Sequence, residues 1–92
     1  GCQTTIIERN TSHHNTVGIT VGCEQNGSTD NVTVRNNMIY NNTFTGIEIG
    51  GYTTNTTGIV NNSIIKNNTC FHNDSNGNHG ELVINKVDNC QI

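Results

Sequence analysis

The chain has 92 residues, of which 30% are hydrophobic, and its 4 basic and 7 acidic side chains give a net charge of −3. This weak acidity does not favour a nucleic-acid or anionic-membrane surface, and no apolar stretch approaches the roughly 20 residues of a membrane span. Asn occurs 18 times, Thr 14 times and Ala not at all, so good helix formers are scarce and an all-β chain is expected.

The first predicted elements are three short strands, Thr5–Asn10, Thr11–His13 and Gly18–Gly22, in which apolar and polar residues alternate. The series recurs 27 and then 31 residues further on, and a fourth copy begins at Cys90–Ile92. The later copies are Val32–Asn37, Met38–Tyr40 and Gly46–Gly50, followed by Ser63–Asn68, Thr69–Phe71 and Glu81–Asn85. Self-similarity at this period predicts stacked units, here triangular coils of three brief strands.

The expected fold is therefore all-β, a single-stranded parallel β-helix (solenoid) of about three coils plus the start of a fourth. At this length it is at most one domain, so residues 1–92 form a single β-helix segment. We expect it to be part of a longer solenoid, because an uncapped stack exposes its interior and its strand edges.

Asn recurs at one place in the repeat, the bend after the first strand, as Asn10, Asn37 and Asn68. Asn tolerates the left-handed backbone that a sharp bend requires, and its amide can both donate and accept along a stack with a spacing of about 4.8 Å. The sequence therefore predicts an Asn ladder in this column. The alternative is a solvated Asn-rich turn.

The alternation also predicts which side chains line the interior. Three inward columns are expected: Thr5, Ile7, Val32, Val34, Ser63, Ile65, Cys90 and Ile92 in the first; Ser12, Ile39 and Cys70 in the second; Ile19, Val21, Ile47, Ile49, Leu82 and Ile84 in the third. Ile6 and Ile64 are apolar at outward positions, so a loop or a partner is expected to cover them.

The four cysteines do not define a disulfide framework. Cys70 and Cys90 fall in inward columns of different sheets, which favours buried thiols over a bridge. Cys2 and Cys23 lie in or beside loops and can pair only if the first coil brings them together. The sequence has no Cys-x-x-Cys pair and no Cys/His spacing typical of zinc, so no metal site is predicted.

The order Val-x-Val-x-Asn-Asn, x-Ile-x, polar turn, Gly-Ile-x-Ile-Gly resembles the right-handed parallel β-helix repeat of the pectate-lyase-like superfamily. The resemblance covers essentially the whole chain. It implies a right-handed coil and a carbohydrate-active or surface protein, because that superfamily includes polysaccharide lyases, glycoside hydrolases, epimerases and tailspikes. Fold analogy alone does not choose among them.

Loops of unequal length predict a cleft. The segments Gly22–Asn31 and Gly50–Asn62 are long, whereas Asn85–Asn89 is short. Glu48 and Tyr52 are expected on the floor of the cleft and an inserted turn, Asn73–Glu81, at one wall. In that turn Asp74, His79 and Glu81 are candidate acids, bases or ligands, and Asp74 joins Glu48 and Tyr52 as a candidate substrate-binding residue. The alternative is a solvated Asn/Gly loop.

Glu8, Arg35 and Lys66 form an outward column on the first strands. Lyases of this resemblance use Lys or Arg as a base and calcium to acidify the uronate, which makes Lys66 and Arg35 weak catalytic candidates. An ordinary surface ion pair between Glu8 and Arg35 is the favoured interpretation, and such pairs contribute little.

Two functional hypotheses follow. The first is a segment of a secreted or cell-surface protein that cleaves, modifies or binds a polysaccharide, with calcium implied by the resemblance alone. The second is a non-catalytic structural or adhesive β-helix, such as a stalk. Neither hypothesis requires nucleic acid or a membrane span, and both allow self-association through open coil ends.

Overall fold

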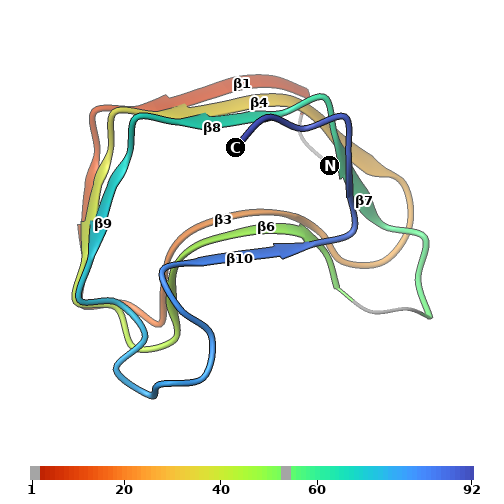
Figure 1. The fold of residues 1–92 in the computed structure, drawn as a ribbon. Coiled ribbons are helices and arrows are strands. Elements are labelled where there is room, and N and C mark those ends of the chain that lie inside the picture. Colours follow the sequence, from red (N-terminus) through yellow and green to blue (C-terminus); the bar gives the residue numbers. More distant parts are fainter. Residues whose placement is uncertain (1–2, 53–54) are drawn as a thin grey trace.

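The computed structural model describes residues 3–52 and 55–92, which form a right-handed β-solenoid of about three coils (Figure 1). No helix occurs in these residues, so none that could cross a membrane does. The strands are β1 (Gln3–Glu8), β2 (Thr11–His13), β3 (Val17–Cys23), β4 (Ser28–Arg35), β5 (Met38–Tyr40), β6 (Thr45–Gly51), β7 (Ile59–Asn61), β8 (Ile64–Lys66), β9 (Thr69–Phe71), β10 (Leu82–Asn85) and β11 (Val87–Asp88).

The strands stack into three parallel sheets whose register follows the sequence repeat. One sheet contains β1, β4, β7, β8 and β11, a second β2, β5 and β9, and a third β3, β6 and β10. Val34 pairs with Ile7 on one side and with Ile65 on the other, which are the predicted offsets of 27 and 31 residues. Gln91 bridges to Ile64 and so begins the fourth coil.

The predicted triangular coil is wrong, because each coil has a fourth short side (Figure 1). This side consists of Ser28–Asp30 at the start of β4, with β7 and β11 stacked on it. The chain turns from this side into the next at a column of left-handed residues, Asn31, Asn62 and Asn89. Segments expected to be loops are therefore strands, and they bury Thr29 and Val60 in the interior.

The predicted Asn ladder is confirmed. The Nδ2 of Asn10 donates to Oδ1 of Asn37 at 3.1 Å, and the Nδ2 of Asn37 donates to Oδ1 of Asn68 at 2.9 Å. The left-handed residues are one position earlier than expected, at Arg9, Asn36 and Asn67. The earlier residue makes the sharp turn, and this turns the following Asn inward, where it bonds to its neighbours above and below.

A second ladder, which the repeated motif did not predict, lies at the next bend. The backbone N–H of Asn15 donates to Oδ1 of Asn42 at 2.9 Å, and Nδ2 of Asn42 donates to Oδ1 of Asn73 at 2.7 Å. Again a left-handed residue precedes each ladder Asn, namely His14, Asn41 and His72. Two rows of amides therefore satisfy the backbone at two corners of the stack.

The interior follows the predicted columns except at Val60, which lies on the unpredicted fourth side of the coil. Val21, Val32, Val34, Ile39, Ile47, Ile49, Val60 and Ile65 form the buried core. Ile84, on the last strand of its sheet, and Ile92 are 48% and 55% exposed in spite of their inward positions. Ile6 is 58% exposed, so no part of the described chain covers it, whereas Ile64 is half-buried.

Candidate functional site

Glu48 and Tyr52 lie together on the outer face of the sheet formed by β3 and β6. They line a shallow hollow of about 50 Å³ with Glu24, Thr20 and nearby glycines. Glu48 pairs in register with Thr20 on the neighbouring strand, and its side chain points away from the buried Ile47 and Ile49. The hollow thus brings together two carboxylates, a phenol and a hydroxyl. Glu24 was not among the predicted site residues.

The expected cleft between two long loops is not present in the described residues. The loops after β3 and β6 stack on each other as further layers of the solenoid. The backbone N–H of Gly58 donates to the carbonyl of Gln25 at 2.9 Å, and that of Ile59 donates to the carbonyl of Gly27 at 3.2 Å. Because loops at equivalent positions of successive coils stack on one another, these two loops do not form opposing walls of a cleft.

Asp74 organises the inserted turn. Its carboxylate accepts backbone N–H groups from Asn78 at 3.0 Å, His79 at 2.7 Å and Gly80 at 2.6 Å. Hydrogen bonds from backbone N–H groups of the turn, chiefly that of Gly80, hold the pKa of Asp74 below its ordinary value. The His79 ring stacks on Phe44 with centroids 3.6 Å apart. Neither Asp74 nor His79 lines the hollow at Glu48 and Tyr52.

We expect the inserted turn to loosen in acid. A carboxyl group whose folded pKa is lowered stabilises the fold above its unfolded pKa, and this contribution is lost as the pH falls through the folded pKa. Amide-exchange protection factors of Asn78, His79 and Gly80 should therefore fall on acidification, whereas that of core Val34 should not. Asp74→Asn should lower the same three protection factors already at neutral pH, and unchanged values would contradict this role for Asp74.

Glu81 closes the second Asn ladder. Its Oε1 accepts the backbone N–H of Asn73 at 3.1 Å, and its Oε2 accepts Nδ2 of Asn73 at 2.5 Å. The carboxylate thus takes the place that the next ladder amide would have. Like Asp74 and His79, Glu81 lies outside the hollow at Glu48, so the structure does not assemble the predicted set in one place.

Lys66 lies in the predicted outward column. Glu8 pairs in register with Arg35, and Arg35 with Lys66. The Nε of Arg35 lies 2.8 Å from Oε2 of Glu8, which confirms the ion pair, and the Arg35 guanidinium lowers the pKa of Glu8. Lys66 itself borders a cavity of about 320 Å³ at the third coil, which shares no lining residue with the hollow at Glu48.

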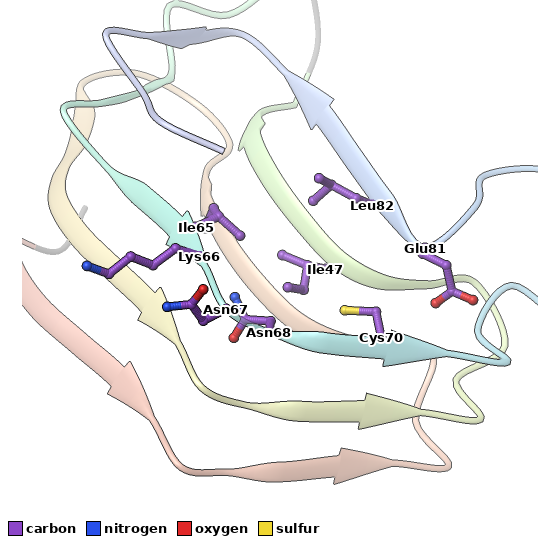
Figure 2. A pocket seen from close by; sticks show the side chains of 8 residues that line it. All are labelled: Ile47, Ile65, Lys66, Asn67, Asn68, Cys70, Glu81 and Leu82. Carbon is purple, nitrogen blue, oxygen red and sulfur yellow. The ribbon is translucent and has the colours of Figure 1, made fainter.

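This end cavity is the uncovered interior of the last coil (Figure 2). The side chains of Ile47, Ile65, Cys70 and Leu82 line it, with Asn68 and Glu81 at its rim. Burial, and to a smaller extent the Glu81 carboxylate, raises the pKa of the Cys70 thiol. Cys70 is therefore a protonated, half-buried filler of the interior.

A polar groove, which the sequence motifs did not predict, runs along the stack at the first Asn ladder. Ladder residues Asn10 and Asn37 form its floor, and the groove has a volume of about 270 Å³. Two rows of exposed side chains form its walls, Arg9, Asn36 and Asn67 on one side and Thr11, Met38 and Thr69 on the other. We call it the axial groove. In the sequence, the residues directly before and after each repeated Asn are the ones that indicate this groove.

The cysteines and metal ligands add no further centre. Cys23, Cys70 and Cys90 are free thiols, as expected for Cys70 and Cys90, while Cys2 lies outside the described residues. Within residues 3–52 and 55–92, no three His, Cys, Asp or Glu side chains gather as a metal site.

These features define the chain as a parallel β-solenoid of about three coils with side-chain amide ladders. It is similar to the "Uncharacterized protein YwoF" of Bacillus subtilis (strain 168), with 36% identity over 83 residues, or 89% of the chain. The chain spans only 18% of the length of that relative. No protein-family model matches the chain, and no solved structure matches it.

Proposed function

We propose that the chain is a polysaccharide-binding segment of a secreted or cell-surface β-helix protein related to the pectate-lyase-like superfamily. The axial groove carries this proposal. Parallel coils place equivalent positions about 4.8 Å apart. Amides therefore recur along one wall, at Asn36 and Asn67, and hydroxyls recur along the other, at Thr11 and Thr69. A linear glycan is a ligand that repeats in the same way.

The lining of the groove suits sugar rings. Asn36 and Asn67 offer amide donors and acceptors, Thr11 offers a hydroxyl, and Met38 offers an apolar surface that is 48% exposed. Arg9 contributes the only charge in the lining, and no carboxylate contributes to it. An acidic polysaccharide, as the superfamily resemblance implies, therefore meets no like charge in the groove.

The test is a titration with acidic and neutral oligosaccharides, monitored by amide chemical shifts and calorimetry. We expect shifts centred on the axial groove and an affinity that rises with chain length. Asn36→Asp should weaken binding of the acidic oligomers about tenfold, because it places a carboxylate in the middle of the groove. Asn41→Asp is the matched control, since it makes the same change at the equivalent left-handed position of the next bend.

Binding that Asn36→Asp leaves unchanged would contradict the groove. Loss of binding on Glu48→Gln with Tyr52→Ala would instead move the glycan to the hollow on β3 and β6. Absence of binding to every oligomer would favour the non-catalytic structural or adhesive alternative.

Glycoside cleavage is a second candidate function, favoured by the two carboxylates in the hollow. Paired Asp or Glu residues are what most glycoside hydrolases use, one as acid and the other as nucleophile or base. Glu24 and Glu48 are the candidates, with Tyr52 beside them. Release of reducing ends from a polysaccharide, abolished by Glu48→Gln and retained in Asn36→Gln, would support this function.

A further inference from the structure

Two imidazole rings meet on the outer face of the sheet formed by β2, β5 and β9. The Nδ1 atom of His13 lies 2.6 Å from the Nδ1 atom of His14, and the two rings meet edge to face with an interplanar angle of 79°. Both side chains are exposed. In a regular strand consecutive side chains point to opposite faces, so the contact between these neighbours needs a local cause.

The cause is the left-handed backbone of His14, which follows β2 directly and has a φ of 57°. This conformation turns the chain, so the side chain of His14 lies beside that of His13. The same geometry recurs in the third coil, where His72 has a φ of 54° and its ring meets that of Phe71 at an interplanar angle of 75°. The contact between the two rings is therefore a property of this bend, and in the first coil both rings carry nitrogens.

Contacts with the second coil hold both histidines in place. The His13 ring stacks on that of Tyr40 with centroids 4.9 Å apart, and the backbone N–H of His14 donates to the carbonyl of Asn41 at 3.1 Å. Tyr40 has a coil on either side, since it pairs with both His13 and Phe71, and it is still partly exposed. Outward side chains of this column therefore keep contact with solvent when both neighbouring coils are present.

We propose that His13 and His14 chelate a divalent transition-metal ion of the Cu²⁺ or Ni²⁺ type through their Nδ1 atoms. Imidazole is a common ligand of these ions. An ion about 2.0 Å from both nitrogens needs them about 2.8 Å apart at the right angle of a square-planar or tetragonal site, and about 3.3 Å apart at a tetrahedral angle. The observed separation of 2.6 Å is closer to the first value, so the geometry favours Cu²⁺ or Ni²⁺ over Zn²⁺.

Binding to two neutral rings needs no net loss of a proton. Without the ion, the Nδ1–H of one ring donates to the bare Nδ1 of the other. In the complex, the proton of the donor ring moves to its Nε2, so that both Nδ1 lone pairs point to the ion. No third His, Cys, Asp or Glu joins the pair in the described part of the chain, so water completes the coordination and the ion stays exchangeable.

A titration with Ni²⁺, followed by calorimetry and by paramagnetic broadening of amide signals, tests this site. Ni²⁺ is the probe because the chain has free thiols, which are preferred ligands of reduced copper. We expect broadening centred on His13 and His14. His13→Tyr and His14→Asn should each weaken binding by more than about tenfold, since removal of a group that merely orients a metal ligand already costs at least that much. Each variant introduces the residue that the second coil carries at the equivalent position, Tyr40 or Asn41, so the fold should be kept.

His72→Asn is the matched control, because it removes an imidazole from the equivalent bend, where the preceding residue is Phe71. It should leave the affinity for Ni²⁺ unchanged. Phe71→His should create a second pair with His72 and so add a second equivalent of bound Ni²⁺. Unchanged binding in His13→Tyr or His14→Asn, an equal loss in His72→Asn, or no added equivalent in Phe71→His would each overturn the proposal.

Discussion

Val34→Asp should abolish cooperative folding. Val34 is 0% exposed and lies between Ile7 and Ile65 in the middle of the first inward column. The introduced carboxylate would have no compensating partner there. Burying it costs several kcal/mol, against a total stability of about 5–15 kcal/mol for a natural domain. Far-ultraviolet circular dichroism should show the loss of the thermal transition.

Thr33→Asp is the matched control for this change. Thr33 is the next residue on β4 and points to the outer face, where it is partly exposed. It introduces the same charge one position away, and we expect its melting temperature to stay near that of the unmodified chain. A cooperative melt of Val34→Asp close to the control would contradict the inward assignment of this column.

The strand columns could be predicted from the sequence because each coil repeats the same alternation. Ile19, Ile47 and Leu82 stand two residues before Val21, Ile49 and Ile84, so the pattern identified both the strand and its inward face. The stacking then required only that equivalent positions of successive coils pair with each other. The observed register follows the repeat offsets. The exposure of Ile84 could not be predicted in the same way, since it depends on contacts with neighbouring coils and not on the alternation within one strand.

The fourth side of the coil could not be predicted in this way. Its strands are two or three residues long, and only Thr29, Val60 and Val87 mark the inward column. A column that begins with Thr and is flanked by Ser28 and Asp30 is hard to distinguish from a polar loop. The packing of Val60 against the core decides the structure here, and a short sequence window does not contain that contact.

The candidate site was predicted less well than the fold. Glu48 was expected to project outward from a strand and Tyr52 to lie in the loop directly after it, and the structure brings the two residues together. Asp74 and Glu81 are polar residues in a loop, and that pattern does not distinguish a catalytic carboxylate from one that accepts backbone N–H groups. The second Asn ladder could have been predicted, because Asn15, Asn42 and Asn73 occupy the same position in the three copies of the repeat, two residues after the second short strand.

Asn42→Asp should destabilise the chain by several kcal/mol at neutral pH, although it hardly changes the shape of the side chain. Asn42 is 0% exposed, and its Nδ2 donates to Asn73 at 2.7 Å and to the carbonyl of Tyr40 at 3.3 Å. An Asp carboxylate has no hydrogen to donate, so acceptors would face acceptors in a buried site. The Glu81 carboxylate, which holds Asn73, adds a like charge one step further along the ladder.

Acid should partly restore the stability of the Asn42→Asp variant. Such a rescue would distinguish loss of the hydrogen-bond donor from loss of packing. The buried carboxyl group favours its protonated form, so its folded pKa lies above its unfolded value. Its protonated form therefore supports the fold below the unfolded pKa, and that support is lost as the pH rises through the folded pKa. Urea unfolding should show a gap between variant and parent that widens with pH. Asn41→Asp, at an exposed left-handed position that Asp tolerates, should show almost no gap, and an equal gap in both variants would contradict the ladder as the cause.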